Sequence, residues 1–519
     1  MLKSSTSFMV GASSNISFLN CVTEAMELAT NSNNFSSSAT KIPIGSTWSP
    51  EDMLFPASEE TVAPLDEQSL ASSTVDLFAL PSPTESDTLV RLYFSAVGLM
   101  IPCIQESPFL ETYRQVRKMG ARSARRSWLG LYNMILAMAA NITTPTSPTE
   151  ERARDSELYF NRALEFAKPL VLGYITFETV QLLLLMASYL QGTSRAAQTW
   201  TFHGVAVKGA YQLGLHSPAA SRMLPLIDRE IRNRTWCWCI MNDRILSATL
   251  GRPCLIPQSH VRVGELEGFQ IANSVPRCDL SSIAFFDAST SLSYIMGGIV
   301  DQLYDQNLGF GTQSSIDDTL CRTFKLRLNL AQWQVSLPPD LQIIKSTDPA
   351  QFFSPRLENT RFRVLLSLRY LSTQILVLRP ILQRFLDIPM VQAAGELRLS
   401  PLRDYGFSAL RDLVSTCIDI FFISNNILAG SNRNLNLGAW WFSGYYTFNA
   451  SLAILGVLLV EKTNLFPEIF LSLSVAEMRA SLSNALDILR GLDNGNTMIS
   501  KCQSTLKRLL HDYDKLDNS

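Results

Sequence analysis

The chain has 519 residues, of which 46% are hydrophobic and 17% are charged, and this composition excludes a wholly disordered protein. Its 44 Lys and Arg against 46 Asp and Glu give a formal net charge of -2, so any nucleic-acid contact must be local or made through a partner. The 25 Gly and 24 Pro are few for this length, which favours long helices over a many-stranded sheet.

Nine cysteines are scattered along the chain without a CxxC pair, which argues against a disulfide framework. Cys237 and Cys239 lie closest together, but on a helix their side chains point about 200° apart and cannot share a metal ion. The first residues lack a sustained apolar run, so we predict no signal peptide and a reducing, intracellular compartment. We expect no metal or other cofactor.

Residues 1–88 differ in composition from the rest, and we predict that they are disordered. Ser, Thr and Asn dominate the first part, and acids alternate with apolar residues from Glu51 to Asp87 without any Lys or Arg. That alternation is typical of activation segments that bind a coactivator, and Asp76, Leu77 and Phe78 are the candidate contact. The alternative is a solvated linker.

From residue 89 to residue 495 the apolar spacing predicts an all-α domain of stacked αα-hairpins. Thr179 to Leu190 is a nearly all-round apolar helix that Gly192 can end. Trp200 to Leu213 is another helix, with Gly214 in the position after its cap and Leu215 making the apolar contact of such a cap. Residues 496–519 are predicted to form a polar C-terminal helix or tail.

One stretch tests a membrane alternative. Trp440 to Val460 contains no charged residue and is long enough to span a bilayer, and no comparable stretch is evident elsewhere. However, Ser443, Thr447, Asn449 and Ser451 lie inside it and no basic flank follows. We therefore predict a buried core helix and no membrane partner.

The stretch from Glu230 to Pro253 combines charged and aromatic residues at helical spacing. Glu230 and Arg234 lie four residues apart and can pair on a helix surface. Asp243 and Arg244 follow beside tryptophans, which indicates a partly buried ion pair that fixes how the chain leaves the helix, with Arg252 as a second donor to Asp243. A helix-packing clamp is therefore favoured over a catalytic role, because removing one member of such a pair would strand a charge.

Known enzyme motifs are lacking: no GxSxG, HExxH, phosphate loop or GxGxxG occurs. The four histidines are too spread for an evident metal site, and we nominate no catalytic residue. A run of basic residues is either a patch for nuclear import or phosphate contact, or a solvated helix face. It comprises Arg114, Arg117, Lys118, Arg122, Arg125 and Arg126.

An ordered series of short motifs resembles a known family. The series is Tyr159–Ala163, Val180–Leu185, Gly204–Val207, Leu213-Gly214-Leu215-His216, Glu230-Ile231-Arg232-Asn233-Arg234-Thr235-Trp236, Asp243-Arg244, Gly251-Arg252-Pro253, Leu330–Trp333 with Leu337–Leu341, and Tyr370 to an Arg379-Pro380 helix end. Over roughly residues 88–490 it resembles the regulatory, or middle homology, region of fungal zinc-cluster transcription factors. The resemblance implies a nuclear transcriptional regulator, often of a metabolic or secondary-metabolite gene cluster.

Two departures limit what the resemblance implies. Family members carry six clustered cysteines that hold two zinc ions near the N-terminus, whereas only Cys21 occurs in the first hundred residues here. The usual continuation after Gly251-Arg252-Pro253 is replaced by Gln258-Ser259-His260-Val261. We therefore expect promoter DNA to be reached through a DNA-bound transcription factor, with a coactivator and a homo- or heterodimer as further partners.

Two alternatives remain open at this point. A stack of apolar helices can enclose a cavity, which would make the chain a small-molecule sensor without DNA contact. The sequence can also be an incomplete gene product that lacks its DNA-binding part. Composition does not distinguish these from the regulator.

Overall fold

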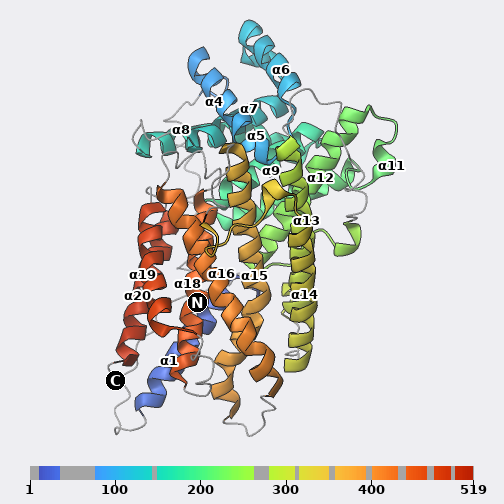
Figure 1. Ribbon diagram of the computed structural model, residues 1–519. Helices are drawn as coiled ribbons and strands as arrows, with labels where there is room; N and C mark the ends of the chain where they lie inside the picture. Colours follow the sequence, from blue (N-terminus) through green and yellow to red (C-terminus); the bar gives the residue numbers. More distant parts are fainter. Residues whose placement is uncertain are drawn as a thin grey trace, which may run out of the picture.

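The computed structural model describes residues 11–34, 76–142, 149–193, 195–261, 280–309, 315–349, 357–392, 400–429, 440–463, 473–492 and 497–517. Every regular element in these ranges is helical (Figure 1), which confirms the all-α prediction. The α-helices are α1 (Asn15–Asn34), α4 (Pro83–Ser95), α5 (Val97–Met100), α6 (Glu106–Met119), α7 (Arg126–Ile142), α8 (Thr149–Leu172), α9 (Phe177–Gln191), α10 (Ala196–Gln212), α11 (Pro218–Ser221), α12 (Leu226–Leu250), α13 (Leu280–Leu303), α14 (Ile316–Ser336), α15 (Leu357–Gln392), α16 (Ser400–Ala429), α18 (Trp440–Lys462), α19 (Val475–Leu492) and α20 (Thr497–Asp517).

Neighbouring helices along the chain pack against each other, as predicted for stacked αα-hairpins. α7 packs on α8, α9 on α10, α12 on α13, α15 on α16, and α18 on α19. In Figure 1, α4 to α9 gather at one end of the molecule, while α1 and α16 to α20 form the other. The long helix α15 is central to the packing, because it contacts α13, α14, α16, α18 and α1.

The cap predicted after α10 has the expected geometry. Gly214 adopts a positive φ of 68°, and its N–H donates to the carbonyl of Tyr211 at 3.0 Å. The N–H of Leu215 donates to the carbonyl of Ala210 at 2.9 Å, and the Leu215 side chain is buried. These two bonds define a Schellman motif, in which a left-handed residue satisfies carbonyls that the helix leaves open.

Helix α18 is the apolar stretch that tested the membrane alternative. Three helical spans are long and apolar enough to cross a membrane: Ser281–Leu303, Thr360–Asp387 and Phe442–Lys462, so the prediction that only one such stretch exists is wrong. The prediction counted only stretches without any charged residue. A long helix with a few charged residues can still have a high mean hydropathy. In the fold, 94% of the most apolar window of Phe442–Lys462 is buried. Protein contacts therefore account for its composition.

The N-terminal segment departs from the prediction of disorder over residues 1–88. Residues 11–34 are ordered, and α1 packs on α18, α15 and α20. Phe18, Leu19, Val22 and Met26 of this helix are buried at helical spacing, so a Ser- and Asn-rich segment still supplies an apolar face. Residues 35–75, which include most of the acidic segment, lie outside the described residues.

The candidate activation residues also lie against the domain. The N–H of Phe78 bonds the Asp76 carboxylate at 3.0 Å, and the Phe78 ring packs edge-on against Phe166 of α8 with centroids 5.7 Å apart. Leu77 is half-buried against the core. The folded domain therefore begins before residue 88, because an aromatic partner is available for Phe78.

The C-terminal segment is more than a polar tail. α20 is helical as predicted, but Ile499, Cys502, Leu506, Leu509 and Tyr513 are buried where it packs on α18 and α19. The polar residues occupy the opposite face of an amphipathic helix.

Arg379-Pro380 does not end a helix, contrary to the expectation from the family pattern. α15 continues through Pro380 to Gln392. A proline inside a helix has no N–H for the carbonyl four residues earlier, which here belongs to Leu376. The hydroxyl of Tyr304 donates to that carbonyl at 2.6 Å and replaces the missing bond, so the helix can continue.

Candidate functional site

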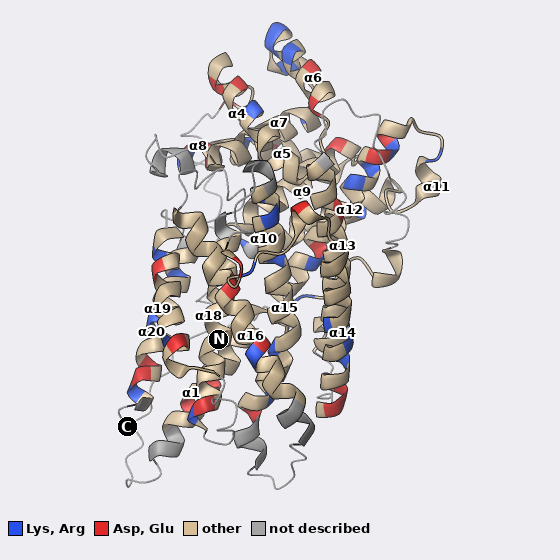
Figure 2. Ribbon diagram, in the orientation of Figure 1, with Lys and Arg blue, Asp and Glu red and all other residues tan. Residues whose placement is uncertain are grey.

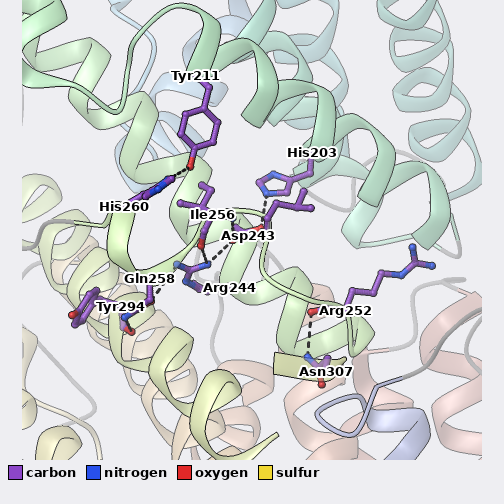
Figure 3. A network of polar contacts seen from close by, with 11 residues as sticks. His203, Tyr211, Asp243, Arg244, Arg252, Ile256, Gln258, His260, Tyr294 and Asn307 are labelled. Carbon is purple, nitrogen blue, oxygen red and sulfur yellow. Dashed lines mark hydrogen bonds and ion pairs between the residues drawn. The ribbon is translucent and has the colours of Figure 1, made fainter. Parts of the chain in front are cut away.

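The residues of the Glu230–Pro253 stretch form a buried polar network around α12 (Figure 3). Asp243 and Arg244 are both fully buried, and Arg244 Nη1 lies 2.6 Å from Asp243 Oδ2. The backbone N–H groups of Leu255 and Ile256 donate to the Asp243 carboxylate at 3.0 and 3.1 Å. The predicted ion pair therefore exists, and it fixes the chain after the helix by binding its main chain directly.

Arg244 completes the attachment of the same loop to α13. Its guanidinium donates to the carbonyl of Ile256 at 2.8 Å and to Gln258 Oε1 at 3.2 Å. Gln258 in turn donates to the carbonyl of Tyr294 at 3.0 Å. A Cβ on Gly297 would lie 2.6 Å from Arg244 Nε, so a glycine is needed where the arginine crosses α13.

Histidines and aromatic rings cover the other side of this pair. His203 of α10 is fully buried, with Nε2 3.4 Å from Asp243 Oδ1. The Tyr211 hydroxyl lies 2.9 Å from His260 Nδ1, and the Tyr211 ring contacts both His216 and Trp236 at centroid distances of 4.9 and 5.2 Å. Gln258 and His260, which replace the family continuation, are therefore parts of the network.

The first half of α12 is tied down at two further points. Glu230 forms its ion pair with Arg234, as predicted, but both side chains are largely buried, and Arg234 also donates to the carbonyl of Pro102 at 3.2 Å. Arg232 donates to the carbonyl of Leu213 and to Ser221 Oγ. The helix thereby holds both the α5–α6 connection and the cap of α10.

The exit of α12 differs from the prediction in one residue. Arg252 is not a donor to Asp243; its guanidinium lies over the Trp200 ring at 5.4 Å. Gly251 turns the chain in the left-handed region with a φ of 65°, which directs Arg252 away from the ion pair (Figure 3). Pro253 lies half-buried in the loop that follows.

This exit also binds the N-terminal segment. The N–H of Gly11 donates to the carbonyl of Gly251 at 2.8 Å, and the N–H of Ser13 donates to Asn307 Oδ1 at 3.1 Å. Asn307 Nδ2 donates to the carbonyls of Ser247 and Arg252 at 3.3 and 3.2 Å. Asn307 has a φ of 59° and ends a run of left-handed residues, a conformation that asparagine adopts more readily than most residues. This junction was not predicted, since no local pattern links residues so far apart.

The basic residues do not form one uniform patch. Figure 2 shows Lys and Arg at the outer end of α6, where Arg114 and Lys118 are exposed. Arg117 instead donates to the carbonyls of Pro81 and Ser82, at 2.9 and 3.3 Å. The remaining three diverge: Arg122 lies over the Phe78 ring at 4.6 Å, Arg125 pairs with Glu178, and Arg126 is exposed.

The network as a whole is a structural clamp made of buried charge. Its cations contact carboxylates, carbonyls and rings of the same chain, so they hold α10, α12, α13 and the loop after α12 together. Across the described ranges, no group of three or more His, Cys, Asp or Glu side chains could hold a metal ion. The sequence correctly indicated the Asp243–Arg244 pair but missed His203 and Asn307, whose partners are distant in the chain.

An all-helical domain that carries the ordered motifs of the sequence corresponds to a known class. Residues 90–334 match the family model described as the fungal specific transcription factor domain, so the chain carries this domain. The match covers α12, its clamp and most of α14.

Two similar proteins are described as transcription factor FBD3. The one from Gibberella moniliformis is 32% identical over 83% of this chain and 58% of its own length. The one from Fusarium pseudograminearum is 30% identical over 97% of this chain and 66% of its own length. Sorbicillinoid biosynthetic cluster transcription factor 2 of Penicillium rubens is 26% identical over 85% of this chain. The chain thus spans about 58 to 66% of the length of the first two. No solved structure gives a significant match.

Proposed function

We propose that the protein is a fungal transcriptional regulator of a metabolic or secondary-metabolite gene cluster. The similarity to proteins described as transcription factors, over 83 to 97% of the chain, is the observation that carries this proposal. One further relative is described as the regulator of a biosynthetic cluster. The charged groups of the clamp around α12 are engaged in holding helices together, so we assign them a structural rather than a catalytic role.

The regulator reaches promoter DNA through a DNA-bound partner. The net charge of -2 provides no bulk attraction to DNA. Arg117 and Arg125, two members of the basic run, are engaged with the same chain. The chain then acts in the nucleus through a transcription factor, a coactivator or a second copy.

Chromatin immunoprecipitation of the tagged protein, together with a gel shift of the purified chain, tests this proposal. Enrichment at promoters without a shift in vitro is the expected result, and deletion of the gene should change expression of the neighbouring cluster. A salt-sensitive shift with the purified chain would refute the partner route. If that shift persists in Arg114→Ala/Lys118→Ala/Arg126→Ala, the DNA contact lies on another surface. Absence of promoter enrichment and of any change in expression would refute the regulatory role.

A further inference from the structure

Two arginines of α15, one buried and one half-buried, have no carboxylate partner among the residues that the structure describes. Arg379 is 2% exposed and Arg369 is half-buried, and neither forms an ion pair with any residue that the structure describes. Buried charges in folded proteins are normally paired, because an isolated ion loses most of its hydration. These two cations therefore require an explanation.

Contacts with neutral groups compensate the arginines only in part. Arg379 donates to the carbonyl of Ser13 and lies over the rings of Phe18 and Tyr304, at 4.9 and 5.4 Å. Arg369 donates to Ser289 Oγ at 3.0 Å and lies over the Phe285 ring at 5.5 Å. Burial lowers the pKa of Arg369. Rings and hydroxyls orient a guanidinium, but they do not neutralise its charge.

Both arginines line one partly open pocket of about 40 Å³ between α15, α18, α12 and the start of α1. Asn15 and Asn449 line it too, and both are buried. The amide nitrogen of Asn15 and Arg379 Nε have no hydrogen-bond partner within the described part of the chain. The pocket therefore offers unused donors beside two positive charges, which suit an anion, together with one unpaired acceptor, Asn449 Oδ1.

A second cavity of about 70 Å³ adjoins the first and shares Asn15, Ile245, Thr249, Phe442 and Tyr445 with it. Its remaining lining is mostly apolar and includes Leu190, Leu246, Leu250 and Met498. One end of the combined space is thus cationic and the other apolar. Water alone would satisfy the donors but would leave the charge and the apolar wall uncompensated.

We propose that this space is the binding site of a small monocarboxylic acid, with its carboxylate towards Arg369 and Arg379 and a short apolar tail between α12 and α18. The larger cavity of about 570 Å³ between α14, α15 and α16 provides a contrast, since its Arg327 is paired with Asp412 and its charge is already balanced. Ser13 and Asn15 form one wall, so the acid also holds the N-terminal segment against α15. This ligand site goes beyond the proposed transcriptional role, and ligand binding can be measured independently of transcription.

Thermal unfolding of the purified full chain with sodium hexanoate tests the site, with hexanamide as the neutral analogue and sodium phosphate as the inorganic anion. Hexanoate should raise the midpoint temperature in a saturable way, and the other two should not. Arg369→Gln should weaken hexanoate binding about tenfold or more, because a charge-assisted contact is lost. Arg327→Gln, in the contrasting cavity, should leave binding unchanged.

Hydrogen exchange supplies a readout that does not depend on the stability of a variant. Hexanoate should slow exchange of residues 11–34 in the unmodified chain, since the acid contacts the wall that this segment forms. Equal stabilisation by hexanamide or phosphate, no effect of hexanoate, or unaltered binding by folded Arg369→Gln would each overturn the proposal. Promoter enrichment does not enter these measurements, so failure here leaves the transcriptional role untouched and the reverse also holds.

Discussion

The buried pair of Asp243 and Arg244 yields the sharpest prediction. Asp243→Asn keeps the shape of the side chain and removes its charge, which strands a fully buried guanidinium. Breaking a buried ion pair costs about 3–5 kcal/mol. The asparagine also has one acceptor oxygen where two backbone N–H groups need one each, and an unsatisfied donor adds about 1–3 kcal/mol. We expect a total loss of roughly 4–8 kcal/mol, a large part of an ordinary folding free energy of about 5–15 kcal/mol.

Urea unfolding followed by tryptophan fluorescence measures this loss, and Trp236 and Trp238 on the same helix report on it directly. The double variant Asp243→Asn/Arg244→Met should be more stable than Asp243→Asn alone, because the stranded charge is gone. Arg490→Gln breaks an exposed pair with Asp487 and should change stability by less than about 1 kcal/mol. A loss below about 1 kcal/mol for Asp243→Asn, or additivity in the double variant, would refute the account of the clamp.

Three further outcomes follow from other contacts. Gly251→Ala should release residues 11–34 to limited proteolysis, because its Cβ would lie 2.4 Å from a backbone oxygen of that segment; protection equal to the unmodified chain would contradict this. Tyr304→Phe should cost about 1–3 kcal/mol by leaving the Leu376 carbonyl unsatisfied, and less in a Pro380→Ala background, where a backbone N–H is restored; equal costs in both would show that the hydroxyl has no such role. Among the described cysteines, exposed Cys321 should react first with iodoacetamide, which peptide mass spectrometry can measure. Burial raises the pKa of Cys103, Cys237 and Cys417, so these thiols should react later. Labelling of a buried cysteine before Cys321 would be inconsistent with the fold.

Local chemistry allowed much of the fold to be predicted. The cap at Gly214 and the pairing of Glu230 with Arg234 depend on residues within one or two helical turns, and both are present. The direction of Arg252 depends on the left-handed turn at Gly251, which reorients everything after it. Because the prediction did not include this left-handed turn, it gave Arg252 the wrong partner.

Contacts between residues that lie far apart in the sequence could not be predicted. The continuation of α15 through Pro380 needs a hydroxyl from Tyr304, which lies more than seventy positions earlier. The order of residues 11–34 likewise depends on Asn307, Gly251 and Arg379, none of which is near in sequence. The prediction of disorder for that segment was based on its many polar residues. Phe18 and Val22 nevertheless supply enough apolar surface for the helix to pack against the domain.

The burial of α18 has a consequence for how the protein is synthesised. α15 and α16 precede this helix on the ribosome, but α19 and α20, which cover its remaining sides, emerge only after it. During that interval a helix apolar enough to enter a bilayer has exposed surface, which is the condition under which nascent chains aggregate or recruit chaperones. A chain that stops before Val475 would keep that surface permanently, so premature termination in this region should yield insoluble protein rather than a shorter functional form.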